Sequence, residues 1–424
     1  MRLIRPFAGL RPAAGRAADV LAPPYDVLTS AEARVRASGR PWSFLHISKP
    51  EIDLPESTSP YAHEVYAKGA ENLAVMLEQG ILLRDPEPCY YVYRLQAGDH
   101  VQTGLVAAAS VPAYDDNRIR KHEYTRPEKE DDRVRQIDAL DAQTGPVLLT
   151  HRAHYGLRQL VTEITWTAPE VDVTSDDGVR HVLWRVSDPA RIDALSALFD
   201  PAAGGDIDAL YIADGHHRSA AASRVAAKRR QAGGAAWTGA CEGFLAVLFQ
   251  ADEVRILDYN RVVRDLNGLT PEQFLQRLGE RFAVTPGATP VRPERSGEFG
   301  MYLAGQWYRL QLDPARLQVA DPVARLDVSL LADHLIEPLL GIHDPRRDQR
   351  IDFVGGIRGL GELVRRVDSG EMAVAFVLYP TSLEQLMAVA DAGEVMPPKS
   401  TWFEPKLADG MVSYPLCRGQ GTDG

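Results

Sequence analysis

Five consecutive residues near the middle of the chain, Asp214 to Arg218, combine an acid, a glycine, two histidines and an arginine. An apolar stretch precedes them and an alanine-rich stretch with a basic end follows, so we expect them where a strand runs into a helix. The first turn of a helix offers unpaired N–H groups and the positive end of the helix dipole, both of which attract phosphate. The segment therefore predicts a phosphate-binding site.

Each residue type in this box has a chemical use. Asp214 can hold a metal ion or accept a proton from a hydroxyl, and His216 can carry a proton between groups in catalysis. Glycine lets backbone amides approach a ligand closely, and arginine can pair with phosphate through two parallel hydrogen bonds. We assign phosphate or nucleotide binding to Gly215, His217, Arg218 and Ser219. A helix cap needs only one of these residues, so we favour a site over a cap.

A second charged segment, residues 118–135, carries seven Arg or Lys and five Asp or Glu side chains. Such density is typical of a solvent-exposed helix with ion pairs four residues apart. A carboxylate held among cations also stays ionised, fit to accept a proton or bind Mg²⁺. Both interpretations stay open. In the second, Glu123 is catalytic and binds Mg²⁺ together with Asp214, and the phosphate or nucleotide contacts are Lys121, His122 and Arg126.

A proline-flanked segment near the C-terminus, residues 397–406, reads PPKSTWFEPK. A lysine beside two hydroxyls can bind phosphate, and an aromatic ring can stack on a base. Prolines and aromatic residues also fasten loops onto cores, and we favour this structural interpretation. In the alternative, the candidate substrate contacts are Lys399, Ser400 and Thr401, together with Asp26 in the N-terminal segment APPYDV.

The composition is that of a globular protein with an acidic balance. The 424 residues are 45% hydrophobic and 25% charged, with a formal net charge of −11. An acidic chain is a poor prospect for general nucleic-acid binding. Three widely spaced cysteines argue against a disulfide framework, and no apolar run approaches the ~20 residues of a membrane span. We expect a cytoplasmic protein without a nucleic-acid or membrane partner, and its oligomeric state stays open.

The order of apolar and polar segments predicts a mixed α/β fold. Residues 89–95 and 101–111 are rich in β-forming residues around a polar turn, which predicts a hairpin. Residues 42–47 alternate like a strand. Thr270 followed by proline predicts the start of a helix in a C-terminal part whose composition differs from that of the preceding chain.

Seven short motifs, in order along nearly the whole chain, resemble one protein family. They are APPYDV, WSFLHI, KHEYTRPEKEDDR, ADGHHRSAA, LDYNRVVRDL, FVGG and MPPKSTWFEPKL. Together they make the chain similar to the bacterial and archaeal family known as domain of unknown function 1015. The resemblance extends from Ile4 to Leu407. It predicts kinship, but no reaction, because the function of that family is not well established.

The box from Asp214 to Arg218 is also similar to the DGHHR box of the free-serine kinases, which belong to the ParB/sulfiredoxin-like superfamily. In those enzymes the box receives nucleotide phosphates, its aspartate lies near the serine hydroxyl, and a separate upstream glutamate is catalytic. The resemblance implies the same roles here, with Glu123 as the upstream glutamate. It also implies a ParB/sulfiredoxin-like core with large additions, in a catalytic region at 1–255 followed by an α+β region at 256–424.

The leading hypothesis is phosphate transfer between ATP or ADP and a small hydroxylated metabolite, with free serine the first candidate and Mg²⁺ as cofactor. Such a reaction needs neutralised phosphoryl oxygens and an aligned hydroxyl more than covalent chemistry. Two alternatives stay open. One is a phosphatase acting on phosphoserine or a similar phosphomonoester, and the other is a nucleotide-sensing protein with little turnover.

Overall fold

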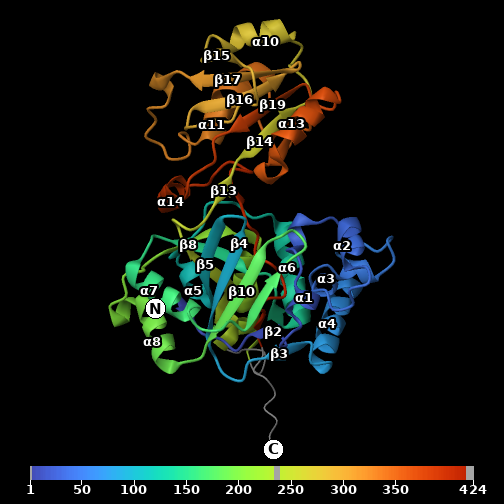
Figure 1. The fold of residues 1–424 in the computed structure, drawn as a ribbon, viewed down its shortest axis with the longest axis vertical. Helices are drawn as coiled ribbons and strands as arrows, with labels where there is room; N and C mark the ends of the chain where they lie inside the picture. Colours follow the sequence, from blue (N-terminus) through green and yellow to red (C-terminus); the bar gives the residue numbers. More distant parts are fainter. Residues whose placement is uncertain (1, 234–238, 417–424) are drawn as a thin grey trace, which may run out of the picture. The chain divides into compact units, whose positions relative to one another are not determined.

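The computed structural model describes residues 2–233 and 239–416, which form two compact units (Figure 1). Unit 1 comprises the described residues of Met1–Val254 and of Pro405–Gly424, and unit 2 comprises Arg255–Glu404. The predicted mixed α/β fold is confirmed. The segment after residue 404, which we expected in the C-terminal region, packs with the first unit because its backbone pairs there.

A nine-stranded mixed sheet forms the centre of unit 1. Its edge strand β6 (Ile119–Arg120) pairs in parallel with β11 (Leu210–Asp214), which pairs antiparallel with β8 (Val147–His151). β8 pairs in parallel with β12 (Gly243–Gln250), a strand that is buried along its whole length. The order continues through β5 (His100–Ser110), β4 (Tyr90–Ala97), β10 (Arg180–Val186) and β9 (Val171–Thr174), and β1 (Ile4–Arg5) pairs with β5. The predicted hairpin is confirmed as β4 and β5.

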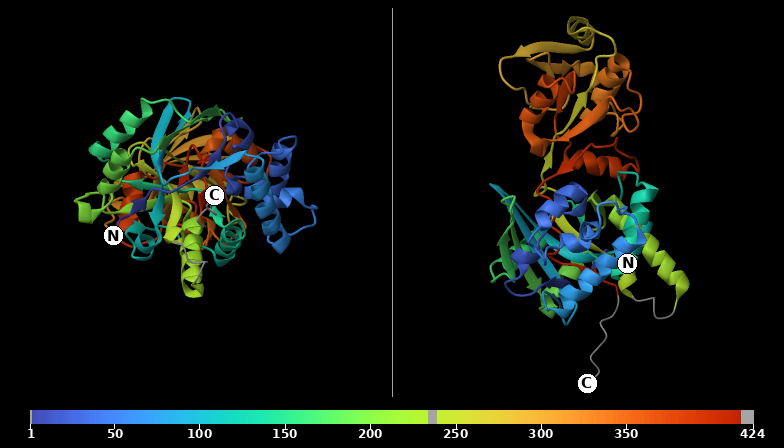
Figure 2. Two further views of the ribbon diagram at one scale, coloured as in Figure 1. Left: turned by 90° about the horizontal axis from the view of Figure 1, so that it is seen from below. Right: turned by 90° about the vertical axis from the view of Figure 1, so that its right-hand side faces the viewer.

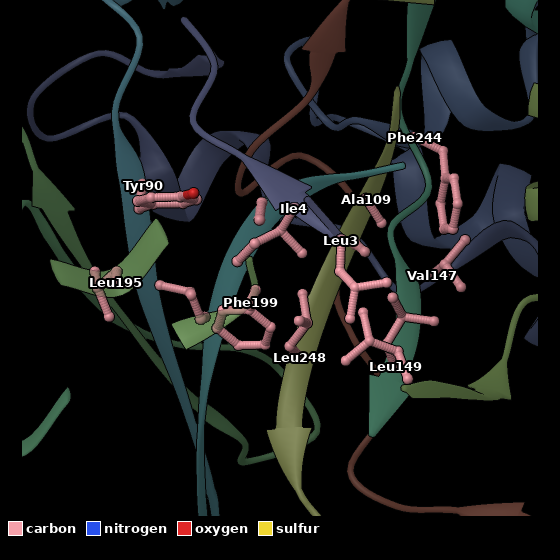
Figure 3. Packing of buried hydrophobic residues seen from close by; sticks show 14 of the residues in the cluster. Leu3, Ile4, Tyr90, Ala109, Val147, Leu149, Leu195, Phe199, Phe244 and Leu248 are labelled. Carbon is pink, nitrogen blue, oxygen red and sulfur yellow. The ribbon is translucent and has the colours of Figure 1, made fainter. Parts of the chain in front are cut away.

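The main core of unit 1 is a buried cluster of residues from this sheet and from helices that pack on it, part of which is drawn in Figure 3. Phe244 and Leu248 of β12 point to the same side because side chains alternate along a strand. They share a buried cluster with residues of α7 (Tyr155–Thr165) and α8 (Pro189–Leu198). Burying such a side chain contributes about 1.5–3 kcal/mol relative to leaving it exposed. Ile212 belongs to the same cluster, so the core fixes β11 and the end of that strand.

Two long helices, α6 (Pro127–Leu140) and α9 (His216–Ala232), pack side by side (Figure 2). Arg224 of α9 bridges Glu130 and Asp131 of α6, at 3.1 and 2.6 Å. The acidic part of the charged segment 118–135 therefore pairs with a neighbouring helix. Exposed pairs of this kind contribute about 0–1 kcal/mol each, so they set the alignment of the two helices more than their stability.

The N-terminal residues add a helical layer with its own buried cluster. It contains α1 (Ala17–Val20), α2 (Ser30–Ala37), α3 (Leu45–Ser48) and α4 (His63–Glu78), with β2 (Leu10–Pro12) paired to β3 (Leu82–Arg84). Residues 42–47, which we expected to form a strand, instead form a turn and most of α3. The reason is that Ser43, Phe44 and Leu45 are all buried, so their alternation does not separate an inner from an outer face.

The end of the chain is joined to unit 1 by backbone pairing. β21 (Tyr414–Pro415) pairs antiparallel with β7 (Ala142–Gln143), just after α6. Asp409 forms a backbone bridge with Ala22 in the N-terminal segment. These pairings place residues 405–416 beside segments that lie hundreds of positions earlier in the sequence.

Unit 2 contains a six-stranded antiparallel sheet. Its strands are, in spatial order, β15 (Phe282–Gly287), β17 (Gln306–Leu312), β16 (Glu298–Leu303), β19 (Val374–Leu378), β14 (Tyr259–Val263) and β18 (Ile351–Gly355). The longer helices are α10 (Pro271–Leu278), α13 (Gly359–Asp368) and α14 (Leu383–Asp391). The predicted helix start is confirmed, since Thr270 and Gln273 form a reciprocal cap on α10.

The composition predicted neither a membrane span nor a disulfide framework. Across residues 2–233 and 239–416, no helix has both the length and the apolar character needed to cross a membrane. Cys89 and Cys241 are buried and not joined in a disulfide, and Cys417 lies outside the described residues.

Candidate active site

The Asp-Gly-His-His-Arg box lies at a strand-to-helix junction, since β11 ends at Asp214 and α9 begins at His216. Gly215 connects them with φ +105° and ψ +29°, a conformation that residues with a Cβ rarely adopt. A Cβ at this position would lie 3.1 Å from Cζ of Arg218. The turn therefore needs glycine both for its backbone and for the close approach of the guanidinium.

Substituting Gly215 by alanine is expected to destabilise unit 1 by about 1–2 kcal/mol, the usual cost of a positive φ for an L residue. The added methyl also displaces the guanidinium of Arg218. Urea unfolding followed by hydrogen exchange of the β8 and β12 amides measures the change in this unit. Gly239→Ala is the matched control, because its Cβ meets nothing within 4 Å and its φ is not positive. Equal stability of the two variants would contradict the geometry.

Asp214 is held between two cations. Nζ of Lys406 donates to Oδ2 at 3.0 Å, and Nη2 of Arg218 lies 3.5 Å from Oδ1. Burial acts to raise the pKa of Asp214, but the ammonium and the guanidinium outweigh it and hold that pKa far below its ordinary value. Asp214 is therefore ionised under all physiological conditions. With so low a pKa it is a poor proton acceptor and a strong electrostatic anchor.

Arg218 points inward, with only 10% of its side chain exposed. One guanidinium nitrogen donates to the Pro146 carbonyl, and Nη2 lies 3.8 Å from Oδ2 of Asp26 as well as near Asp214. Burial acts to lower the pKa of Arg218, yet the surrounding carboxylates keep it above its ordinary value. From sequence we expected a phosphate contact at Arg218. The structure makes Arg218 an internal electrostatic anchor as well.

His216, the first residue of α9, contacts Glu123. Oε2 of Glu123 lies 3.6 Å from Nδ1 of His216, and the backbone N–H of His122 donates to Nε2 at 3.4 Å. Burial and neighbouring positive groups hold the pKa of His216 well below its ordinary value, so the ring is neutral. Because Nε2 accepts, the hydrogen-bond network assigns the proton to Nδ1, directed at Glu123. About half of the Glu123 side chain is exposed, so this carboxylate is open to a ligand.

His122 packs against His216 and supports the position of that ring. Its ring packs edge-on against the His216 ring, with 4.5 Å between centroids. Burial lowers the pKa of His122 to about 4, so it is neutral at pH 7. The side chain is 2% exposed. Because His122 is buried against His216, it is better placed to support that ring than to make the direct phosphate contact that we expected.

The other residues predicted to bind phosphate differ in how they are placed. His217 is half-buried and accepts from the backbone N–H of Arg126 at 3.0 Å. Nζ of Lys121 donates to the Tyr114 carbonyl at 2.7 Å and lies over the ring of that tyrosine. Ser219 is fully buried, and its hydroxyl donates to the His216 carbonyl within α9. Lys121 and Ser219 are thus engaged with backbone in this structure.

Two residues near the C-terminus that sequence analysis did not single out contribute to the site. Lys406 binds Asp214 directly. Asp409 is 1% exposed and lies on a pocket that Arg218 also lines. Lys406 does belong to the proline-flanked segment 397–406, but no sequence signal connects that segment with the box.

The candidate substrate contacts Lys399, Ser400 and Thr401 belong to unit 2. Lys399 has a positive φ of 58°, and its carbonyl accepts from Arg261 at 3.1 Å. The Ser400 hydroxyl donates to the Pro397 carbonyl at 2.6 Å, and its own carbonyl accepts from Thr381 at 2.9 Å. These bonds fix the loop within unit 2, as the favoured structural interpretation expects. A role in substrate binding stays a prediction.

The donors around the box do not fit a resident metal ion. Within the described parts of the chain, no group of three or more His, Cys, Asp or Glu side chains could hold one. Both oxygens of Asp214 face cations, and Oε2 of Glu123 faces His216. Mg²⁺ often binds through one or two carboxylates with substrate phosphates completing its shell. Asp214 and Glu123 alone therefore do not make a complete Mg²⁺ site.

The family model described as "Protein of unknown function (DUF1015)" matches residues 4–329. The chain therefore belongs to this family, as the ordered motifs predicted. No curated protein matches the sequence.

Several solved structures show a low similarity to the chain. A free serine kinase in complex with AMP is 15% identical, with a TM-score of 0.32 over 68% of this chain and 84% of the other. A conserved hypothetical protein from Pyrococcus furiosus is 15% identical, with a TM-score of 0.32 over 69% and 90%. SbnI from Staphylococcus aureus, truncated at its C-terminus, is 13% identical, with a TM-score of 0.38 over 73% and 87%. At this level of similarity, the residues of the site have to carry any functional assignment.

Proposed function

We propose that this protein transfers phosphate between a nucleotide, ATP or ADP, and a small hydroxylated metabolite, with free serine as the first candidate. The observation that carries the proposal is the meeting of Arg218 and Lys406 on Asp214 at the start of α9. Two cations and the positive end of a helix converge there, beside a carboxylate that is 32% exposed. Such a place favours a group with several negative charges.

Phosphoryl transfer depends mainly on neutralising the charge of the phosphoryl oxygens and aligning the two reacting oxygens. Arg218 and Lys406 supply fixed positive charge, and Asp214 holds both in place. The first amides of α9 add hydrogen-bond donors, since they have no partner within the helix. A nucleotide would bring Mg²⁺ with its phosphates.

Glu123 is the residue best placed to accept the proton of the acceptor hydroxyl. Its carboxylate is accessible, and the contact with neutral His216 fixes one oxygen. In this proposal the carboxylate accepts a hydrogen bond from the hydroxyl and takes its proton as the phosphate arrives. Asp214 instead orients the two cations. The two carboxylates thus have different proposed roles because their environments differ.

The similarity of the box to that of the free-serine kinases supports the same reaction class and makes serine the first acceptor to test. The same likeness leads us to propose that the sheet of unit 1 contains a ParB/sulfiredoxin-like core. Its mixed strand order, with β11 leading into α9, is compatible with that proposal.

Phosphorus NMR of the purified full-length protein tests the proposed function. The protein is incubated with Mg²⁺ and either ATP or ADP, together with serine, threonine or homoserine. We expect a new phosphomonoester signal, with ADP or AMP as the second product. Release of inorganic phosphate from phosphoserine in the absence of nucleotide would indicate a phosphatase instead. Nucleotide binding with no product of either kind would indicate a nucleotide-sensing protein instead.

Replacing Glu123 by glutamine is expected to slow transfer by no more than about 10²-fold, the lower end of general-base effects. The reason for this modest size is that the half-exposed site lets water take the proton instead. Initial rates at saturating nucleotide and acceptor provide the measurement. Glu128→Gln, an exposed glutamate five residues along the chain, is the matched control. Equal rates for both variants would remove Glu123 from the mechanism.

A further inference from the structure

A pocket lies beside the box and is lined in part by Arg218. It is lined by residues of the N-terminal segment, α6, the β7–β8 connection, α9 and the C-terminal segment, among them Tyr25, Arg133, Gly145, Arg218 and Asp409. Its enclosed volume is about 30 Å³, room for one or two groups the size of a water molecule or an ammonium.

Asp409 is the unusual group in this pocket. Its side chain is 1% exposed, and among the described residues no donor reaches hydrogen-bonding geometry with either carboxylate oxygen. The backbone N–H of Tyr25 faces the carboxylate but is too poorly placed to count as a hydrogen bond. Buried carboxylates are normally paired or hydrogen-bonded. An unpaired one on a pocket wall therefore points to a ligand that supplies the missing donors.

The surroundings of Asp409 limit what that ligand can be. Arg218 and Arg133 also line the pocket, and each already has a carboxylate near it, Asp214 for Arg218 and Asp132 for Arg133 at 2.6 Å. Both arginines are thus engaged elsewhere, while Asp409 is not. A metal ion would need further oxygen ligands and would face these two guanidinium groups. A compact organic cation with several N–H donors suits the carboxylate better.

The backbone leaves room for such a group. At Gly145, a Cβ would lie 3.8 Å from Oδ1 of Asp409 and 3.2 Å from Cδ of Arg218. Glycine at this position therefore keeps the space beside the carboxylate open. Its φ is not in the positive region, so an alanine there would change the space and not the backbone.

We propose that Asp409 binds the ammonium group of a primary amine, and that the acceptor of the reaction is therefore an amino-bearing hydroxy compound. The role of the amine as acceptor rests on the proposed function, whereas the binding of an amine at Asp409 does not. Arg218 lines the pocket and also contacts Asp214. A ligand whose ammonium sits at Asp409 thus lies next to the helix start, where the phosphate is expected. Serine and ethanolamine have the required groups, and glycerate lacks the amine.

Binding of the amine is expected to release a proton. Burial raises the pKa of the unliganded Asp409 carboxyl to about 7, with Asp26 adding to the rise and the guanidiniums of Arg218 and Arg133 opposing it. Tyr25 and Tyr93 also face this group. An ammonium beside the carboxylate lowers its pKa. Near pH 6.5 the group therefore passes from mostly protonated to ionised when the amine binds.

Titration calorimetry of the full-length protein in two buffers of different ionisation enthalpy tests the proposal. Serine, ethanolamine and glycerate are titrated separately into wild type, Asp409→Asn, Gly145→Ala and the exposed-residue control Asp193→Asn. We expect wild type and Asp193→Asn to bind the two amines with proton release and to bind glycerate at least tenfold more weakly. Asp409→Asn should lose at least tenfold in amine affinity together with the proton release. Gly145→Ala, which keeps the carboxylate, should also weaken the amines.

The outcomes separate this inference from the proposed reaction. If amine binding depends on Asp409 but the protein transfers no phosphate, the amine site is supported and the proposed phosphate transfer is rejected. Phosphate transfer to glycerate as readily as to serine would uphold the kinase and reject the pocket. Unchanged amine binding by Asp409→Asn, or no amine binding by wild type, would also overturn the inference. Asparagine keeps the size of the side chain and removes only an unpaired charge, so the variant is expected to fold.

Discussion

Asp214→Asn is expected to lower kcat for phosphate transfer by at least about 10²-fold, with nucleotide affinity unchanged or higher. The substitution keeps the shape but removes the charge that holds Lys406 and Arg218 together. Preorganised charges of this kind account for rate factors of about 10²–10³ each. Nucleotide binding does not fall, because a negative charge beside the phosphates has been removed. A loss in kcat without a loss in binding is the signature of an interaction used mainly in the transition state.

Single-turnover rates and calorimetric nucleotide binding separate these two effects. Asp193→Asn, an exposed aspartate on α8, makes the same chemical change away from the site. If Asp214→Asn transferred phosphate as fast as this control, the box would be structural and the proposed function would lose its basis.

Arg218→Met is expected to destabilise unit 1 by about 3–5 kcal/mol, the cost of removing one member of a buried charge pair. Methionine roughly fills the volume but leaves Asp214 without the guanidinium that lies 3.5 Å from its carboxylate. The loss of stability caused by Arg218→Met depends on pH. The pKa of Asp214 is lowered by Arg218 in the folded state, so that stabilisation is present above the ordinary value of 3.8 and is lost as pH falls through the folded pKa. The deficit should therefore be largest near neutral pH and shrink in acid.

Hydrogen exchange of the β8 and β12 amides at pH 7 and near pH 2.5, below the ordinary carboxyl pKa of 3.8, reports the stability of this unit specifically. The matched control is Arg224→Met on the same helix. That arginine is 45% exposed and pairs across to α6, so its loss should cost no more than about 1 kcal/mol. A cost for Arg218→Met as small as that of the control would show that Asp214 does not need the arginine.

Local sequence patterns predicted those parts of the protein that depend on neighbouring residues. The hairpin of β4 and β5 followed from β-forming residues on either side of a turn. The cap of α10 followed from Thr270 and the proline after it. By contrast, residues 42–47 are too few for alternation to tell a strand from a buried turn, and they became part of α3.

The sequence by itself determined the junction at Asp214 to Arg218, because an apolar strand, a glycine and an alanine-rich helix leave little choice for the backbone. It also determined the family, through seven motifs in order. Only the tertiary structure decided what surrounds the junction. Lys406 stands 192 positions from Asp214 and reaches it because the C-terminal segment pairs with β7 and with Ala22. Backbone pairing between distant segments leaves no periodic trace in either of them, so the cations that fix Asp214 and the unpaired carboxylate of Asp409 become visible only in the folded chain.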